Sequence, residues 1–131
     1  MTDSGPRLTL QTVLAFDAAT CALMGALLAL ASGPIAGLTA ILGLLLLVAG
    51  LLLLPIAVFM AMFARAATIP AWAAQVIVGG NLLWVLASVL PPVFGLIAPN
   101  GLGWLFLLMQ AAVVAVFAGF EWTLRGRSAV A

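Results

Sequence analysis

The chain contains no histidine, no tyrosine and no lysine, and it has a single cysteine, Cys21. It therefore lacks the commonest general base and transition-metal ligand, the amine that forms Schiff bases and the lysine of a P-loop. Conventional hydrolytic triads, histidine-ligated haem and retinal are excluded. A zinc site would have to rely on Cys21 and scattered carboxylates, which are poor ligands for it. We expect neither an enzyme nor a bound cofactor or metal.

Charge is also scarce: 5% of the 131 residues are charged and 67% are hydrophobic, with a mean hydropathy of +1.41. A chain with so little polar surface cannot cover a water-soluble globule, so lipid must solvate it. Four arginines against three acids form no basic stripe for nucleic acid. The expected partners are the lipid bilayer and either other membrane-protein subunits or a second copy of the chain.

Four apolar segments are long enough to cross about 30 Å of hydrocarbon, a distance that needs roughly 20 helical residues. Ser-Gly-Pro at 32–34 ends the first segment, and Pro55 should kink the second. Pro70 suits the first turn of the third, which the proline pair at 91–92 ends or sharply bends. The sequence predicts an all-α fold, a single antiparallel four-helix transmembrane domain over residues 1–131, with helices at about 8–31, 40–64, 71–90 and 102–124.

The arginines predict the orientation. They lie outside the apolar segments, at positions that a four-helix protein places on one side of the bilayer: Arg7, Arg65, Arg125 and Arg127. The segments predicted on the other side, around 32–39 and 96–103, carry no charge. Because cytoplasmic segments collect lysine and arginine, we expect both termini in the cytoplasm and a multi-pass protein of the bacterial inner (plasma) membrane.

The first apolar segment has a second interpretation, because Ala-Leu-Ala at 29–31 resembles a signal-peptidase site. Its apolar stretch is longer than that of a usual signal peptide, and Asp17 interrupts it. Cys21 does not read as a lipoprotein cysteine, since Thr20 precedes it where a smaller residue is expected. We therefore expect this segment to remain as the first membrane helix.

Three polar side chains fall near the middle of their predicted helices: Asp17, Asn81 and Gln110. A carboxylate at mid-membrane costs about 2.5 to 3.5 kcal/mol when ionised, so Asp17 should face the bundle. We expect Asn81 and Gln110 to be its partners across helices, in one intramembrane polar cluster. The cluster is a hydrogen-bonded clasp that holds three helices in register, a site that handles a proton or a solute, or a contact with another protein.

A shallower polar set, Gln11, Gln75 and Glu121, lies close to the predicted cytoplasmic boundary and suggests a polar layer there. Glu121 can reach interfacial water or pair with Arg125 one turn later. Trp84 stands mid-span in the third helix, where it is either a packing residue or part of a pocket wall.

Small residues recur at helical spacing and predict close helix contacts, because lipid gives helices no hydrophobic drive to associate. They are Ala18, Ala22 and Ala26 in the first helix, Gly43, Gly50 and Ala57 in the second, and Ala111, Ala115 and Gly119 in the fourth.

Over nearly its whole length the chain resembles a family of small, uncharacterised bacterial four-helix integral membrane proteins, which implies no particular activity. The chain is also similar in size and helix count to the small multidrug resistance transporters. Their proton-coupling site is a lone carboxylate in the first helix, where Asp17 stands here. This chain has Asp in place of Glu and no tyrosine to supply that family's aromatic surroundings. The first resemblance rests on Phe16-Asp17-Ala18-Ala19, Gly33-Pro34, the run from Gly80 to Ser88, Gln110-Ala111 and Glu121.

The lack of a catalytic set and the short loops favour a protein that acts by packing. We expect an accessory or assembly subunit of a larger membrane complex. The alternative is a proton-coupled carrier of a small or lipophilic solute that works as a homodimer through Asp17, since four short helices enclose little volume alone. A lipid- or pigment-binding membrane module is a third hypothesis.

Overall fold

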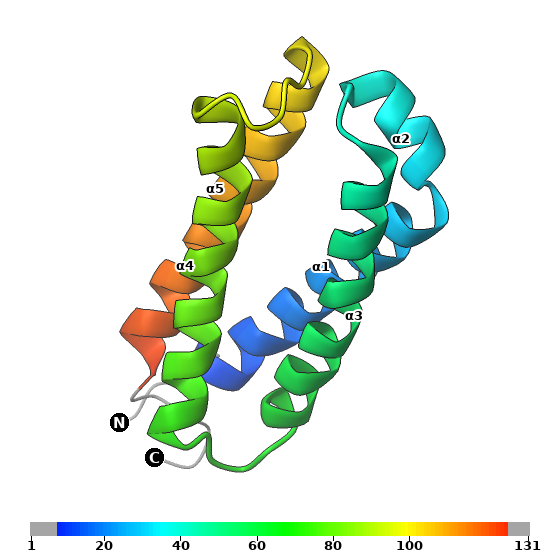
Figure 1. The fold of residues 1–131 in the computed structure, drawn as a ribbon. Helices are drawn as coiled ribbons and strands as arrows, with labels where there is room; N and C mark the ends of the chain where they lie inside the picture. Colours follow the sequence, from blue (N-terminus) through cyan, green and yellow to red (C-terminus); the bar gives the residue numbers. More distant parts are fainter. Residues whose placement is uncertain (1–7, 126–131) are drawn as a thin grey trace.

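The computed structural model describes residues 8–125, and over this range the chain is helical with no strand. Four of its five helices, α1, α3, α4 and α5, are long and apolar enough to cross a membrane (Figure 1). The predicted all-α fold with four membrane-spanning helices is confirmed. In chain order the helices are α1 (Leu10–Leu30), α2 (Ser32–Thr39), α3 (Gly43–Ala64), α4 (Ala71–Val93) and α5 (Gly101–Leu124).

The segment expected to be a turn after the first membrane helix is a helix of its own, α2, of eight residues. Its proline, Pro34, stands in the first turn, where a missing N–H costs no intrahelical hydrogen bond. The helix ends at Ala40, which has a left-handed φ of 58° and donates its N–H to the carbonyl of Ala36. Pro34 therefore lies at the start of a second helix and not in a loop.

The third membrane helix, α4, continues beyond its predicted end at residue 90 and passes through both Pro91 and Pro92 to Val93. Prolines in a last turn remove only the bonds to the carbonyls four residues earlier. Gly95, with a φ of 76°, then turns the chain, and the N–H of Leu96 donates to the carbonyl of Pro91 at 2.8 Å.

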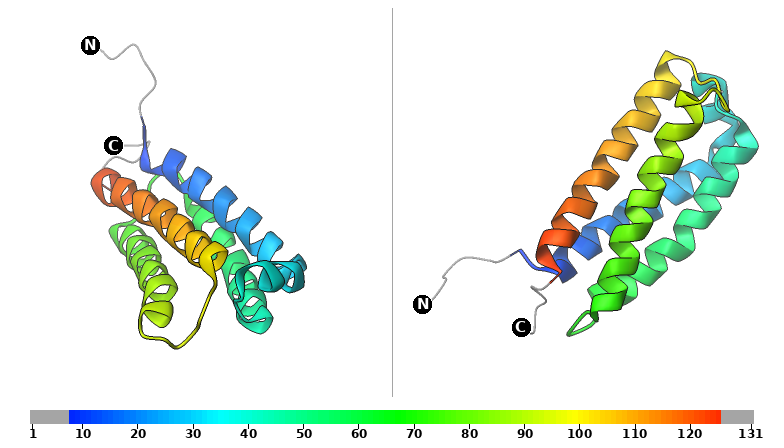
Figure 2. Two further views of the ribbon diagram at one scale, coloured as in Figure 1. Left: turned by 90° about the horizontal axis from the view of Figure 1, so that it is seen from above. Right: turned by 60° about the vertical axis from the view of Figure 1, so that its left-hand side comes forward.

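The membrane helices pack as two pairs, α1 against α3 and α4 against α5 (Figures 1 and 2). Contacts of α5 with α1 and α2 join the pairs, whereas α3 and α4 do not pack along their length despite their short connection. The most completely buried apolar side chains lie at one end of the bundle, near the start of α1 and the end of α3: Leu10, Leu14 and Met60.

Glycines set the crossing of α1 and α3. A Cβ at Gly50 would lie 2.7 Å from the carbonyl oxygen of Gly25 and 2.7 Å from the backbone nitrogen of Ala29. Of the predicted small-residue contacts, Gly50 therefore makes one, and Gly25 completes it. Ala22 and Ala115, at the centre of two other stripes, are exposed, so they do not hold the bundle together.

Asn100 ties the other end of the molecule together. Its side-chain oxygen caps α5 by accepting from the N–H of Gly103 at 2.8 Å, and its amide donates to the carbonyl of Leu38 at 2.9 Å. Its backbone N–H donates to the carbonyl of Thr39 at 3.0 Å. The start of α5 is thus fixed to the end of α2.

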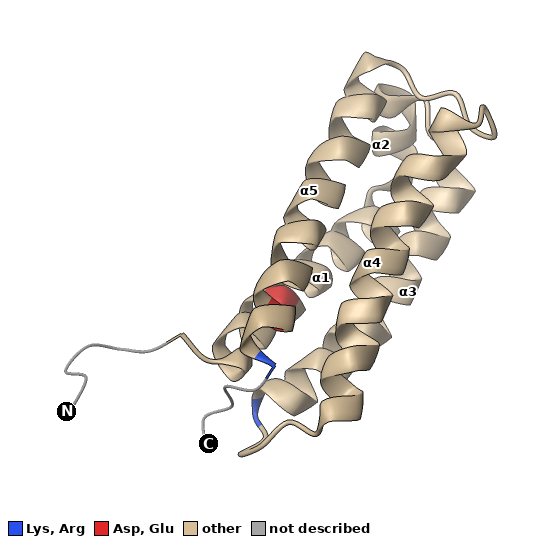
Figure 3. Ribbon diagram, turned by 90° about the vertical axis from the view of Figure 1, so that its left-hand side faces the viewer, with Lys and Arg blue, Asp and Glu red and all other residues tan. Residues whose placement is uncertain are grey.

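The two arginines within the described chain, Arg65 after α3 and Arg125 after α5, lie at the same end of the bundle (Figure 3). This is the end at which α1 begins, as the antiparallel alternation of four spanning helices requires.

Candidate functional site

Asn81 joins three helices inside the bundle. Its Nδ2 donates to Oδ2 of Asp17 on α1 at 2.9 Å and to Oε1 of Glu121 on α5 at 2.7 Å. All three side chains are buried, with exposed fractions of 7% for Asn81 and 1% for each acid. We call Asp17, Asn81 and Glu121 the carboxyl–amide triad.

Helical spacing positions each member of the triad. Asp17 lies on the buried face of α1 with Leu10, Leu14 and Cys21, one or two turns away. The thiol of Cys21 donates to Oδ1 of Asp17 at 3.6 Å. On α4, Ile77 and Asn81 share the face that meets the other helices. Asp17 and Asn81 are thus carried inward beside mostly apolar neighbours on their own helices.

Glu121 was expected to reach interfacial water or to pair with Arg125, but it is buried and accepts a hydrogen bond from Asn81. It precedes the end of α5 by three residues, roughly 5 Å, whereas Asn81 lies ten residues, roughly 15 Å, from the start of α4. They meet because the helix ends are staggered: the α3–α4 connection extends beyond the end of α5 (Figure 3). A depth counted along one helix cannot include this offset.

Gln110 was expected to be the third member of the cluster, and it is not. Its Oε1 accepts from the indole Nε1 of Trp84 at 2.8 Å, and its Nε2 donates to the carbonyl of Leu107 at 3.0 Å. Eleven residues separate Gln110 from Glu121, so the two lie about three turns apart along α5. Only Glu121 is level with Asn81, and it takes the place that we expected Gln110 to fill.

The other two residues predicted for the cytoplasmic-side layer, Gln11 and Gln75, have different surroundings. Gln11 is buried and donates to the carbonyls of Ala66 and Ala67 in the α3–α4 connection, at 3.3 and 3.0 Å. Gln75 is exposed on the outer face of α4. The hydrogen bonds of Gln11 to Ala66 and Ala67 fix the start of α1 to the α3–α4 connection.

The triad has no cationic partner within residues 8–125. Arg125 does not pair with Glu121, because its guanidinium lies 3.5 Å from the ring centroid of Trp122 and donates to the carbonyl of that residue. The second oxygen of Glu121, Oε2, is buried without a hydrogen-bond partner. Two ionised carboxylates this close in an apolar setting would repel each other, so the triad is stable when it holds at least one proton.

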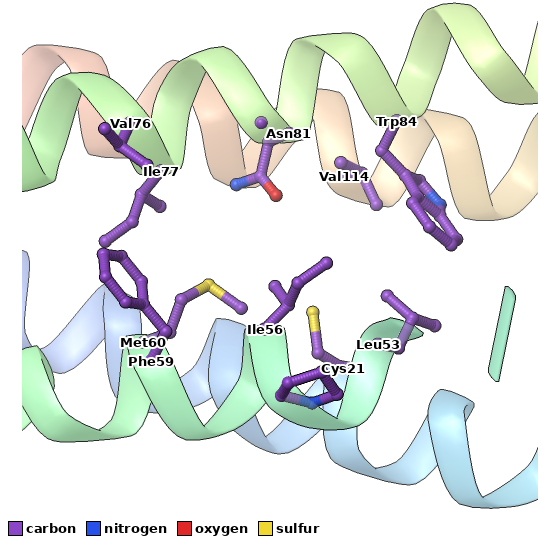
Figure 4. A pocket seen from close by; sticks show the side chains of 12 residues that line it. Cys21, Leu53, Ile56, Phe59, Met60, Val76, Ile77, Asn81, Trp84 and Val114 are labelled. Carbon is purple, nitrogen blue, oxygen red and sulfur yellow. The ribbon is translucent and has the colours of Figure 1, made fainter. Parts of the chain in front are cut away.

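Two cavities adjoin the triad, and a third lies beyond it. One of about 340 Å³ lies between α3 and α4 and is lined by Asn81 and Cys21 (Figure 4). A second, of about 500 Å³, is bounded by α1, α2 and α5 and reaches Asp17 and Gln110. A third, of about 250 Å³, lies further along the bundle. Trp84 lines all three, so it is a wall between cavities as well as a packing residue.

No protein-family model, curated protein or solved structure matches the chain. The triad and its cavities are the features that indicate a function. In the part of the chain that the structure describes, no three acidic, cysteine or histidine side chains form a group able to hold a metal ion. The site consists of two carboxyl groups that bond to one amide, and it lies beside cavities with mostly apolar walls.

Proposed function

We propose that the protein is a small membrane carrier that couples the movement of a lipophilic solute to a proton held by Asp17 and Glu121. The observation that carries the proposal is the triad itself, in which two buried carboxyls share the amide nitrogen of Asn81 and no cationic side chain of residues 8–125 pairs with them. A bound proton neutralises one of the two carboxylates and so removes the repulsion between them. Intramembrane carboxyls of this kind mark proton and solute paths.

Space for a solute lies directly beside the acid. Asp17 is part of the wall of the cavity of about 500 Å³, a volume within the usual range of ligand pockets. Apolar side chains such as Met24 and Phe106 line most of it. One chain therefore encloses a pocket, and the carrier does not need a homodimer to make one.

The packing of the helices supports the same function. The α1–α3 and α4–α5 pairs are each well packed but touch each other over a smaller area, with a cleft between α3 and α4. Two rigid halves joined in this way suit a rocking motion around a central site. The position of Asp17 in the first helix is also that of the proton-coupling acid in the small multidrug resistance transporters, which the chain resembles in size.

The distribution of the arginines supports one orientation of the protein in the membrane. We infer that the end of the bundle with Arg65 and Arg125 faces the cytoplasm and that the membrane is the inner membrane of a bacterium. Asp17 and Glu121 would then exchange their proton with water on the cytoplasmic side when the two helix pairs separate there.

Proton release on solute binding tests the carrier. Purified protein in weakly buffered detergent is mixed with tetraphenylphosphonium, dodecanol or dodecanoic acid while a pH dye records protons. We expect at least one of these probes to release protons from the native protein and from Gln75→Leu, an exposed control, but not from Asp17→Asn. Identical traces from native protein and Asp17→Asn with all three probes would refute the carrier.

A second function, an accessory subunit of a larger membrane complex, is favoured by one surface. On the outer face of α5, Ala115 and Gly119 are exposed at four-residue spacing, and a Cβ at Gly119 would meet no atom within 4 Å. Small residues at this spacing allow a second membrane helix to approach closely. If Ala115→Leu removes a co-purifying subunit on a native gel, and no probe releases protons, the accessory function replaces the carrier.

A further inference from the structure

Among residues 8–125, no donor bonds the amide oxygen of Asn81. Both hydrogen bonds of this side chain leave from Nδ2, and Oδ1 accepts none from the described residues although Asn81 is only 7% exposed. The orientation follows from the chemistry, since two carboxyl oxygens accept from Nδ2 and a flipped amide would need a proton on each acid. The oxygen must then face away from both acids.

Oδ1 faces the cavity between α3 and α4. Figure 4 shows the amide of Asn81 directed into this space, with Ile56 and Met60 of α3 opposite it. The other lining side chains are almost all apolar, and Cys21 supplies a thiol that already donates to Asp17. An acceptor in apolar surroundings without a donor is unfavourable, and a ligand that supplies the donor removes that cost.

The cavity is open to the hydrocarbon of the membrane. Ile56 and Val76 line it from opposite sides and are 40% and 55% exposed on the outer surface. Gly80 also lines it, and a Cβ at that position would meet no atom within 4 Å. A molecule dissolved in the bilayer can therefore enter between α3 and α4 without passing through water.

We propose that this cavity binds a neutral lipophilic molecule with one hydroxyl group, which enters from the bilayer and donates its hydroxyl hydrogen to Oδ1 of Asn81. A neutral donor fits better than a cation. The carboxyl oxygens of Asp17 and Glu121 that face Asn81 are already engaged by Nδ2, so the group that the cavity presents is an uncharged amide oxygen. Apolar walls and one neutral acceptor do not replace the hydration of a cation.

The inference rests on the proposed function, because it places a binding site for a lipophilic molecule beside the same triad, in a cavity separate from the one that Asp17 lines. A hydrogen bond accepted at Oδ1 polarises the amide and strengthens the two bonds that Nδ2 donates. Occupation of the cavity is in this way linked to the proton that Asp17 and Glu121 hold. The hydroxyl itself transfers nothing and acts only as a donor.

Photolabelling measures the binding. The probes are a dodecanol and a dodecylphenol that each carry a diazirine in the chain, with the methyl ether of each and the matching dodecyl trimethylammonium as controls. We expect each hydroxyl probe to label the native protein roughly tenfold more than its ether, a ratio that corresponds to about 1.4 kcal/mol. The label should lie on peptides that contain Ile56 or Ile77, which face the cavity.

Two neighbouring glycines supply a matched pair of variants. Gly80 and Gly79 have equally open surroundings, but only Gly80 lines this cavity. We expect Gly80→Leu to lower labelling by the hydroxyl probes about tenfold and Gly79→Leu to leave it within about twofold. If Gly80→Leu does not fold, Ile56→Trp fills the same space from the exposed side of α3 and should lower labelling likewise.

Each outcome decides the matter. Equal labelling by hydroxyl probe and ether, stronger labelling by the ammonium probe, or labelling unchanged in both Gly80→Leu and Ile56→Trp, would overturn the inference. Labelling that depends on Gly80 without proton release by any probe would leave the binding site standing and refute the carrier. Proton release by tetraphenylphosphonium that persists in Gly80→Leu, with no preference for hydroxyl probes, would support the carrier and refute this site.

Discussion

Glu121 accepts a 2.7 Å hydrogen bond from the amide of Asn81, although the two residues lie at different depths when counted along their own helices. This bond and the matching one to Asp17 bring α1, α4 and α5 together at a single nitrogen atom. Because α3 does not pack along α4, the triad is a principal polar link between the two helix pairs. Loss of either hydrogen bond should therefore lower the stability of the protein.

Replacing Asn81 by leucine should destabilise the protein. The substitution leaves oxygens of Asp17 and Glu121 buried without their donor, which costs roughly 1 to 3 kcal/mol. Thermal unfolding in detergent measures the loss, and Gln75→Leu, an exposed amide on the same helix, should have little effect. If both variants lose the same amount of stability, the hydrogen bonds of Asn81 do not stabilise the protein.

Asp17 should tolerate asparagine better than leucine. Asparagine keeps an oxygen that accepts from Nδ2 of Asn81, whereas leucine removes the acceptor and strands the donor. We expect Asp17→Leu to lower the unfolding free energy by roughly 1 to 3 kcal/mol more than Asp17→Asn. Unfolding in a denaturing detergent titration measures the difference, and equal losses would argue against the hydrogen bond as the stabilising contact.

The crossing of α1 and α3 should depend on Gly50. A Cβ there would approach the backbone of Gly25 and Ala29 to 2.7 Å, and backbone cannot move aside cheaply. Gly50→Ala should therefore destabilise by roughly 1 to 3 kcal/mol, while Gly79→Ala, in open space, should change stability by less than about 0.5 kcal/mol. Thermal unfolding of the two variants in the same detergent checks this, and an unaffected Gly50→Ala would show that the helices separate readily.

Trp84 and Gln110 should be energetically coupled. The indole N–H donates to Oε1 of Gln110 at 2.8 Å, and this bond fixes a side chain that lines three cavities. A double-mutant cycle with Trp84→Phe and Gln110→Leu should give a coupling of about 0.6 to 1.7 kcal/mol, typical of hydrogen bonds between membrane helices. Additive effects in thermal unfolding would show that the bond contributes nothing.

Orientation is testable by reporter fusions. Fusions after Arg65 and at the C-terminus should report a cytoplasmic location, and fusions after Gly33 or Asn100 should report an exported one, because arginine is retained on the cytoplasmic side. Alkaline phosphatase and green fluorescent protein provide opposite readouts for each site. A cytoplasmic signal after Asn100 would contradict four alternating spans.

The sequence alone was enough to predict four membrane spans, because hydropathy and length are properties of each segment by itself. It was also enough to single out Asp17 and Asn81, since a strongly polar side chain in an apolar run has to find a partner. Local signals were less reliable near helix ends. Pro34 stands in the first turn of α2, where proline is compatible with a helix, and Pro92 stands inside α4 one residue before its end at Val93.

Tertiary structure decided which polar groups meet. Glu121 bonds Asn81 while Gln110 turns to Trp84, because α4 and α5 are displaced along their axes and each residue can reach only what lies level with it. The close approach of α1 and α3 at Gly25 and Gly50 is a second feature of this kind. These are relations between distant segments, and no window of hydropathy along the chain contains them.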